Sequence, residues 1–527
     1  MTAGFHNLAD IVRKRARTDP DNEALIDAIR EVSFSWGELD RRRRQVANLL
    51  RSTCEPSARV ATVLPICSVA AELVFATASA GLILVPVNER LTAHELAFVF
   101  GDAEVAAVIT NADHIAAVRE AVATASPDAV IYVVDAPAGD GLSYDAAVAA
   151  SYDREPIDQA DVDDVAMLIY TSGTTGRPKG VMLTHGNFLS SANNYLMESF
   201  APGDGTYLAC VPFSHVGCVV HLAAAMRGLT LVVTPFTPDR ILTLIERHRV
   251  THIAMVPTMI ALVLNVEDID RYDCSSLRRV LYAAAPMPLP LLRRAIAKFG
   301  PILEQFYGLT ESTGLVTILR SDEHAVDDDA TAATLSRLAS CGKEVTGAWV
   351  DVLDTDGHPV APGERGEIVI RGPGVMAGYW RNELATAATI KAGWLHSGDV
   401  GSRDADGFLT IVDRLKDVII TGGSNVYPKE VELVLQLVDG VSEASVVGVA
   451  HDVWGEIVTA VVVCESGREV PEEMLMTACQ AELAPYKQPR VIRYADALPK
   501  NAMGKVDKVA LRADLAAAGQ PEPARSQ

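Results

Sequence analysis

The sequence predicts an α/β protein with a large amino-terminal domain of repeated βα units, which includes a β-rich subdomain, and a small α+β domain at the carboxyl end. Three observations favour this fold class. The chain has 527 residues, which is too long for a single hydrophobic core. Helical and strand-like hydrophobic patterns alternate through its first half. After Trp349 the pattern changes to short strands separated by turns.

Predicted helices and predicted strands follow one another along the first half of the chain. A capping box at Thr92 and Glu95 indicates the start of one helix. Repeated units of this kind predict largely parallel sheets with helices on both faces. The predicted helices cover 36–50 and 70–80, and the predicted strands cover 58–65, 82–87, 105–110 and 129–135.

The second half is expected to hold two smaller units. Segment 349–371 alternates between strand patterns and DG or PG turns, which predicts a β-rich subdomain from about residue 340 to 412. The large domain would then cover 1–412. Beyond it, a helix at 429–438, a strand at 444–450 and a helix near 475–483 predict a compact α+β domain. The tail from Ala516 is expected to be disordered.

Charge and composition exclude several classes of partner. The 46 Lys and Arg against 68 Asp and Glu give a net charge of −22, which argues against nucleic acid or an anionic membrane. The arginine run 41–44 is expected to form the solvated face of a helix. The apolar region 211–233 is interrupted by polar residues, so no integral membrane association is expected. Eight cysteines without a CxxC pair predict a reducing, cytoplasmic location.

The segment YTSGTTGRPKG (170–180) carries the clearest chemical signal. A plain turn between strands would explain its glycines but not the Pro-Lys-Gly that follows. A Walker loop is excluded, because Arg177 and not Lys follows the second glycine. Its hydroxyl groups, its glycines and its lysine together suit a polyphosphate: Thr171, Ser172, Gly173, Thr174, Thr175, Gly176 and Lys179.

This segment resembles the phosphate loop of the adenylate-forming superfamily, which includes acyl-CoA synthetases, peptide-synthetase adenylation domains and firefly luciferase. Four further motifs follow in the order of that family. They are QFYGLTES (305–312), GWLHSGDV (393–400), DRLKD (413–417) and PKNAMGK (499–505). The resemblance therefore covers nearly the whole chain, from about residue 24 to 507.

The resemblance implies roles for individual residues. Tyr307 would stack on the adenine of ATP, Thr310 would bind the α-phosphate and Glu311 would bind Mg²⁺. A carboxylate is the natural ligand for such a hard cation. Asp399 and Arg414 would bind the ribose. Lys505 would bridge the carboxylate of the substrate and the α-phosphate.

The resemblance also implies an activity in two steps. A carboxylic acid would attack the α-phosphorus of ATP to give acyl-AMP and pyrophosphate, and the acyl group would then pass to the thiol of CoA. A mobile small domain, residues 417–527, would rotate between the two steps about a hinge at 413–416, centred on Lys416. Gly422 and Gly423 would leave room for the pantetheine arm of CoA.

The sequence restricts the acid. Amino-acid-activating relatives carry an aspartate in the segment that matches PFSHVGC (212–218), and this chain has none there, so a free amino acid is disfavoured. The segment instead resembles that of fatty and aryl acid activators. A core position would explain His215 equally well, and His185 is expected to be structural. The residues expected at the acid pocket are His215, Val216, Gly217 and Ala283.

One segment departs from the family pattern. Where the family often has a leading glycine between the adenine and acyl sites, this chain reads Tyr282-Ala283-Ala284-Ala285-Pro286. Ala284 is expected beside the nucleotide, and the additional methyl groups would narrow the pocket.

Three alternatives to a CoA ligase stay open. The chain could load a free-standing acyl carrier protein, although it has no fused carrier domain. A luciferase-like oxygenase would use the same acyl-AMP. A nucleotide sensor would bind ATP without exchanging pyrophosphate, although Lys505 and Glu311 argue against it.

Overall fold

A computed structural model of the chain describes residues 5–135, 142–156, 160–171, 177–200, 205–285, 287–324, 332–422, 424–451, 454–500 and 505–517. The chain divides into two compact units. Unit 1 comprises Met1–Asp351, Val369–His396 and Gly407–Leu409, and unit 2 comprises Val352–Ile368, Ser397–Asp406 and Thr410–Gln527. The predicted boundary at residue 412 and the predicted hinge stay predictions.

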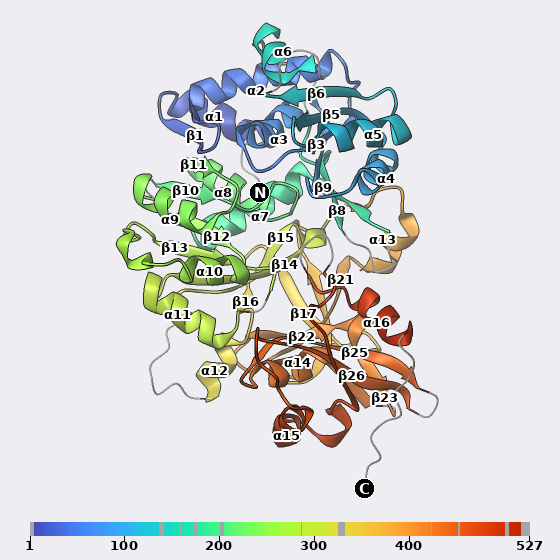
Figure 1. Ribbon diagram of the computed structural model, residues 1–527. Helices are drawn as coiled ribbons and strands as arrows, with labels where there is room; N and C mark the ends of the chain where they lie inside the picture. The colour runs from blue at the N-terminus through green and yellow to red at the C-terminus, as the bar shows by residue number, and fades with distance from the viewer. Residues whose placement is uncertain are drawn as a thin grey trace. The chain divides into compact units, whose positions relative to one another are not determined.

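Unit 1 contains an eight-stranded sheet in the order β19-β9-β8-β4-β3-β5-β6-β7. Figure 1 labels β3, β5, β6, β8 and β9 of this sheet. Strands β3 to β6 pair in parallel, which confirms the arrangement predicted from their hydrophobic runs. Strands β8 and β9 form an antiparallel hairpin, and β19 pairs with β9. The strands are β3 (Arg59–Val63), β4 (Ile83–Val87), β5 (Val105–Asn111), β6 (Val130–Val134), β7 (Leu142–Ser143), β8 (Val165–Thr171), β9 (Lys179–Thr184) and β19 (Gly378–Tyr379).

A nine-stranded sheet in the order β16-β15-β14-β13-β12-β10-β11-β1-β2 also belongs to unit 1. Its central strands, from β1 through β11, β10, β12 and β13 to β14, are parallel. The strands are β1 (Glu23–Asp27), β2 (Val32–Ser35), β10 (Thr206–Ala209), β11 (Thr230–Val233), β12 (His252–Met255), β13 (Arg279–Tyr282), β14 (Leu303–Leu309), β15 (Gly314–Leu319) and β16 (Lys343–Glu344).

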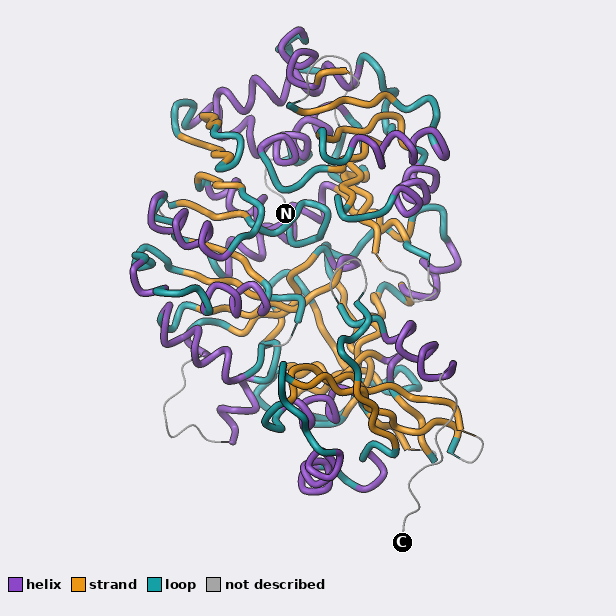
Figure 2. Tube along the Cα trace, viewed as in Figure 1, coloured by secondary structure: helices purple, strands orange, loops and turns teal. Residues whose placement is uncertain are grey.

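Helices cover both faces of these sheets, as the alternating pattern predicts (Figure 2). Helices α4 and α5 share a core with the eight-stranded sheet, and α9, α10 and α11 share one with the nine-stranded sheet. The helices of unit 1 are α1 (Ala9–Thr18), α2 (Trp36–Arg51), α3 (Ser68–Ala80), α4 (Ala93–Ala103), α5 (Ile115–Ala125), α6 (Tyr144–Ala150), α7 (His185–Glu198), α8 (Cys218–Arg227), α9 (Pro238–Arg247), α10 (Pro257–Leu264), α11 (Leu289–Phe299), α12 (Ala332–Leu338) and α13 (Glu383–Thr389).

Helix α3 lies between the two sheets, and all of its side chains are buried. It contacts β4 of one sheet and β1 of the other. Its polar residues are paired, as burial requires. Glu72 accepts hydrogen bonds from Arg42 Nε at 2.6 Å and from Tyr144 Oη at 2.8 Å. The predicted capping box is also confirmed, because Thr92 and Glu95 exchange hydrogen bonds at the start of α4.

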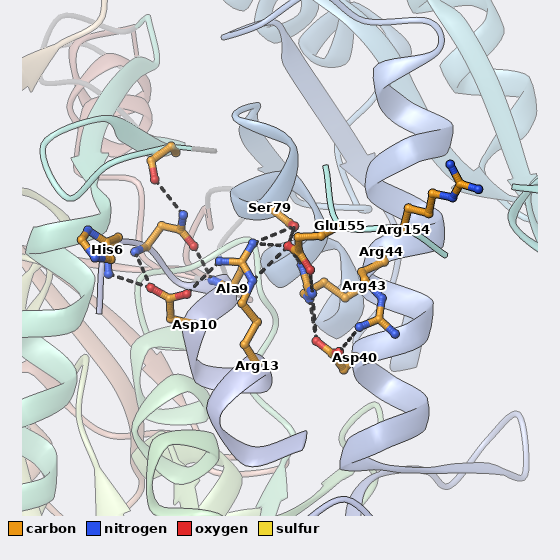
Figure 3. Close-up of polar contacts among 12 residues, drawn as sticks. His6, Ala9, Asp10, Arg13, Asp40, Arg43, Arg44, Ser79, Arg154 and Glu155 are labelled. Carbon is orange, nitrogen blue, oxygen red and sulfur yellow. Dashed lines mark hydrogen bonds and ion pairs between the residues drawn. The ribbon is translucent and has the colours of Figure 1, made fainter. Parts of the chain in front are cut away.

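Arg43 in the arginine run on α2 is the main correction to the predicted fold, whereas Arg41 is exposed as predicted. Figure 3 shows Arg43 inside a network of ion pairs and not on a solvated face. Its side chain is fully buried, pairs with Asp40 at 2.9 Å and contacts Glu155 at 2.6 Å. Burial raises the pKa of Glu155, but hydrogen bonds and charges from Arg43 and Arg13 outweigh this effect and lower it to about 2. The hydrophobic pattern of α2 could not reveal this, because the acidic partner comes from a distant loop.

The remaining strands form two five-stranded sheets. The first has the strand order β17-β18-β21-β20, and β22 pairs with β21. Four of its strands contain residues of both units: β17, β18, β21 and β22. The predicted β-rich segment corresponds to this sheet. Its strands are β17 (Trp349–Leu353), β18 (Arg365–Arg371), β20 (Ile390–Lys391), β21 (Trp394–Arg403) and β22 (Leu409–Arg414).

Unit 2 has its own α+β core around the second of these sheets, of order β24-β23-β26-β25 with β27 beside β26. Helices α14 and α15 pack in one hydrophobic core with this sheet. Helix α16 packs in a second hydrophobic cluster, which contains the strand residues that point to the opposite face of the sheet. The elements are β23 (Ile419–Thr421), β24 (Ser424–Val426), α14 (Pro428–Gln436), β25 (Val441–His451), β26 (Gly455–Cys464), α15 (Glu472–Glu482), β27 (Val491–Tyr494) and α16 (Lys508–Ala517).

The carboxyl-terminal tail and the absence of membrane-spanning helices are also predicted from the sequence. Helix α16 continues to Ala517, so the first residues of the predicted tail are helical, and residues 518–527 lie outside the described part. Throughout the described ranges, every helix is too short or too polar to cross a membrane.

Candidate functional site

The nine-stranded sheet brings several predicted site residues to one edge. Strands β10, β12, β13 and β14 are parallel neighbours, so their carboxyl ends share an edge, which is where open α/β sheets bind ligands. The residues that follow these strands at this edge are His215, Val216 and Gly217 after β10, Ala283 and Ala284 after β13, and Thr310 and Glu311 after β14. The predicted adenine-stacking residue, Tyr307, lies buried within β14 itself.

The turn after β14 is fixed by close backbone packing. A Cβ atom on Gly308 would lie 1.4 Å from the carbonyl oxygen of Gly314, so only glycine fits there. Thr310 and Glu311 then form a short 3₁₀ turn with Ser312 (Thr310–Ser312). Ser312 Oγ accepts a hydrogen bond from the backbone N–H of Leu309 at 2.9 Å. These contacts fix the backbone from which Glu311 extends.

Glu311 is held from a distant segment of the chain. Tyr379 Oη on β19 donates a hydrogen bond to Glu311 Oε1 at 2.9 Å. The backbone N–H of Met376 donates to the carbonyl oxygen of Glu311 at 2.8 Å. Tyr379 could not be predicted from the sequence, because nothing in Gly378-Tyr379-Trp380 indicates a polar partner 68 residues away.

The predicted phosphate loop connects β8 and β9. Thr171 ends β8 and pairs with Lys179, which begins β9. The intervening predicted residues Ser172, Gly173, Thr174, Thr175 and Gly176 lie outside the described residues. The Nζ of Lys179 lies 4.9 Å from the centroid of the Tyr379 ring. Tyr379 therefore contacts both a cation at the end of this loop and the carboxylate of Glu311.

The base of the hairpin is anchored to α4. Tyr170 Oη donates to Asp102 Oδ2 at 2.6 Å, and Trp380 Nε1 donates to the carbonyl oxygen of Asp102 at 3.0 Å. A Cβ atom on Gly180 would lie 3.1 Å from the Tyr170 ring and 3.3 Å from Trp380, so glycine permits this packing. Burial is the main cause that raises the pKa of Tyr170 well above its usual range, and the hydrogen bond to Asp102 raises it further.

Three of the predicted acid-pocket residues, His215, Val216 and Gly217, lie just before the amino end of α8. His215 is half-buried, and its Nδ1 is 3.2 Å from Ser214 Oγ. Gly217 is the residue before α8, and a Cβ atom there would lie 3.1 Å from Val211 Cγ1. His185 is fully buried and burial lowers its pKa to about 4, which agrees with the structural role expected for it.

Tyr282, the residue before the alanines that follow β13, is buried and makes two polar contacts through its hydroxyl group. Tyr282 Oη lies 2.8 Å from His324 Nε2 and donates to Gln305 Oε1 at 3.2 Å. Ala284 is exposed and has a positive φ of 71°. That conformation costs a non-glycine residue about 1 kcal/mol.

Unit 2 brings together the other predicted nucleotide residues. Asp399 on β21 is nearly fully buried, and its Oδ1 lies 2.8 Å from Nε of Arg414 at the end of β22. The backbone N–H of Asp399 donates to Ser397 Oγ at 3.0 Å. The two residues predicted to bind ribose are therefore direct neighbours.

Lys505 lies in the electrostatic environment of this same pair. The residue is exposed over much of its surface, yet partial burial of the ammonium group and the charge of Arg414 lower its pKa, while Asp399 opposes the change. The loop before it is closed by a bridge between Lys500 and Val506 and by a hydrogen bond from Asp507 N to Pro499 O at 2.8 Å.

The predicted hinge and thiol-tunnel residues also lie in unit 2. Lys416 is in a 3₁₀ turn (Leu415–Asp417), whose Asp417 accepts a hydrogen bond from Arg512 of α16 at 2.9 Å. Gly422 has a φ of 56°, and a Cβ atom there would lie 2.9 Å from Trp454 Cε3. Gly423 lies outside the described residues.

The donor set suits a hard divalent cation that brings most of its own ligands. Within the described ranges, no three His, Cys, Asp or Glu side chains are grouped closely enough to form a metal cage. Glu311 offers a single carboxylate, and Mg²⁺ commonly binds through one or two carboxylates plus phosphate oxygens and water. Glu311 therefore fits Mg²⁺ that arrives with a polyphosphate, and it does not fit a structural zinc or calcium site.

Family models match most of the chain. The model described as AMP-binding enzyme matches residues 12–380, and the model described as AMP-binding enzyme C-terminal domain matches residues 430–505. The first match contains the phosphate loop and Glu311, and the second ends at Lys505.

Individual proteins are similar over almost their full length. A feruloyl-CoA synthase of an Amycolatopsis species is 37% identical over 504 residues, which are 95% of this chain and 97% of that protein. A long-chain fatty acid–CoA ligase of Mycobacterium tuberculosis is 33% identical over 514 residues, 97% and 99% of the two chains. The solved o-succinylbenzoate CoA synthetase of Bacillus subtilis, in complex with its acyl-adenylate, has a TM-score of 0.83 and 29% identity over 99% of each chain.

Proposed function

Because this chain belongs to the AMP-binding enzyme family, we propose that it is an AMP-forming acyl-CoA synthetase that acts on a fatty or aryl carboxylic acid. ATP, the acid and CoA are its substrates. The observation that carries the proposal is the contact of Tyr379 with both Glu311 and Lys179. It supports a site where a carboxylate suited to a cation and the cationic end of a phosphate loop act on the same polyphosphate.

The chemistry requires activation of the acid. A carboxylate is a poor acyl donor because its leaving group would be oxide. Its oxygen attacks the α-phosphorus of ATP, a P–O bond to the β-phosphate breaks, and acyl-AMP and pyrophosphate form. The thiolate sulfur of CoA then attacks the acyl carbon, and AMP leaves. The protein contributes mainly by positioning and by stabilising charge on the phosphates.

In the proposal, unit 1 supplies the nucleotide and acid residues. The hydroxyl groups and backbone of the phosphate loop, with Lys179, bind the triphosphate, and Thr310 binds the α-phosphate. Tyr307 and Ala284 lie against the adenine. Glu311 would hold Mg²⁺, which neutralises phosphate charge when it is bound. His215, Val216, Gly217 and Ala283 line the acid pocket.

Unit 2 supplies the ribose and charge-stabilising residues. The neighbouring Asp399 and Arg414 support binding of the ribose hydroxyls. Lys505 supplies positive charge where the acid meets the α-phosphate. Lys416 serves as the hinge for the second step, and Gly422 and Gly423 border the path of the thiol.

Two further features of the proposal concern the acid and the compartment. One relative is named as a feruloyl-CoA synthase and another as a long-chain fatty acid–CoA ligase. In this chain the segment 212–218 contains no acidic residue beside His215, which supports an acid without an α-ammonium group. We propose a cytoplasmic location, which the eight free cysteine thiols support because disulfides are rare there.

The decisive experiment is acid-dependent exchange of pyrophosphate into ATP over a panel of fatty, aryl, dicarboxylic and amino acids. We expect exchange with a fatty or aryl acid and none with amino acids. Addition of CoA should then give a thioester and AMP. An enzyme that forms acyl-AMP but ignores CoA would indicate a carrier protein as acceptor, and oxygen uptake with light would indicate a luciferase-like reaction. Absence of exchange with every acid would contradict the proposal.

A further inference from the structure

Tyr379 lies on β19, which pairs with β9, the strand that carries Lys179. On β19, Gly378 pairs with Met182 and Tyr379 pairs with Val181 of β9. The backbone N–H of Trp380 donates to the carbonyl oxygen of Gly180 at 2.8 Å, and that of Tyr379 donates to Thr386 Oγ1 at 2.9 Å. The side chain of Tyr379 is buried. Its hydroxyl group therefore has a fixed position relative to the end of the phosphate loop.

The fixed hydroxyl group meets one oxygen of a carboxylate. Within the described part of the chain, Tyr379 is the only side chain that donates a hydrogen bond to Glu311, and it does so to Oε1 at 2.9 Å. A hydrogen bond to an ionised acceptor is stronger and more directional than one between neutral groups. With Oε1 engaged in this way, Oε2 is the oxygen that remains for a cation. Mg²⁺ demands near-ideal octahedral geometry, which a rotating or bidentate carboxylate would distort.

We propose that Tyr379 is a positioning residue for Mg²⁺: its hydroxyl group orients Glu311 to present a single oxygen to the ion, while its ring holds Lys179 beside the same phosphates. The inference rests on the proposed function, because it assigns Glu311 to the metal. It gives one residue two separable tasks. The hydroxyl group acts on the metal carboxylate, and the ring, 4.9 Å from Lys179 Nζ, acts on the cation.

The variant Tyr379→Phe separates the two tasks because it removes only the hydroxyl group. We measure ATP binding by titration calorimetry, once with saturating Mg²⁺ and once with a chelator. The expected result is that affinity for ATP with Mg²⁺ falls roughly tenfold, as for loss of a hydrogen bond to a charged group. Affinity for ATP without metal should not change, because the ring still packs against Lys179. A residue that merely stabilised the fold would lower both affinities.

A matched control is Tyr132→Phe, which removes a buried tyrosine hydroxyl from β6 of the same sheet, 3.4 Å from Thr53 Oγ1. It should leave both affinities unchanged. A double-mutant cycle with Glu311→Gln completes the test. If Tyr379 acts through Glu311, then Tyr379→Phe should have no further effect on metal-dependent binding once Glu311 has been replaced.

The outcomes distinguish this inference from the proposed function. Equal metal dependence of ATP binding in the wild type and Tyr379→Phe would overturn the role of Tyr379, and so would additive effects of the two substitutions. Either result would leave the ligase proposal standing as long as the wild type exchanged pyrophosphate. Failure of that exchange would contradict the ligase, whereas the calorimetric comparison does not depend on turnover.

Discussion

Lys505 is the single side chain on which the proposed first step depends most directly. Partial burial and then the charge of Arg414 lower the pKa of its ammonium group, and Asp399 opposes this shift. A bridge joins Lys500 and Val506, which lie on either side of Lys505.

We therefore predict that Lys505→Ala lowers the rate of acyl-AMP formation by about a hundredfold or more, the usual cost of removing one charge-stabilising group. The measurement is acid-dependent pyrophosphate exchange at saturating ATP. The control is Lys500→Ala in the same loop, where the lysine is exposed and pairs with Glu443 at 3.0 Å. It should retain the wild-type rate. Equal losses in both variants would indicate damage to the loop and not loss of a specific charge.

At the scale of elements, the 3₁₀ turn around Lys416 is tied to two helices of unit 2. Arg512 of α16 pairs with Asp417 at 2.9 Å. Asp413, just before the turn, accepts a hydrogen bond from the backbone N–H of Lys429 at 2.7 Å, at the start of α14. A backbone rotation that separates the two half-reactions would therefore be confined to the few residues of this turn, and it would have to break the hydrogen bond between Asp413 and Lys429.

The predicted effect of Lys416→Pro follows from this confinement. Proline restricts φ to about −65° and also restricts the residue before it, so a rotation at residue 416 would be blocked. We expect acyl-AMP to form at a nearly normal rate in pyrophosphate exchange, while release of acyl-CoA falls by at least tenfold.

Lys416→Ala, which keeps the backbone free, serves as the control and should support both steps. The hinge assignment would be wrong if Lys416→Pro reduced both half-reactions to the same extent.

At the scale of the whole molecule, unit 1 buries several histidines in their neutral form. Burial lowers the pKa of each to about 4: His185, His221, His252 and His324. In the unfolded chain their pKa would be about 6.5. The folded state therefore binds fewer protons than the unfolded state between these two values. The stability that these buried neutral histidines contribute is fully present above about pH 6.5, and it is lost as the pH falls toward 4.

We predict a fall in the free energy of unfolding of about 1 kcal/mol for each of these histidines between pH 7.5 and 5.5. Urea unfolding followed by fluorescence at several pH values would measure it. His221→Asn should make the pH dependence shallower, because it removes one buried titrating group. His6→Asn should not, because His6 is about four-fifths exposed. A stability independent of pH over this range would contradict the predicted linkage.

The sequence by itself determined the type and order of many helices and strands, and it contained the motifs that identify the family. Runs such as 58–65 and 105–110 are too apolar to lie at a surface, so they had to become buried parallel strands, and the capping box at Thr92 marked a helix start. The site motifs could be found because their chemistry is local. The phosphate loop and the segment around Glu311 each carry their functional groups within a few consecutive residues.

Tertiary structure alone decided which distant groups meet. Arg43 looked like a surface residue because its partner Glu155 is 112 positions away. Tyr379 and Glu311 are 68 positions apart, so their contact was hidden for the same reason. The physical reason is the same in both cases. Hydrophobic periodicity reports whether a residue faces the core, but a hydrogen bond between polar groups depends on a register between strands and helices that only the folded chain establishes.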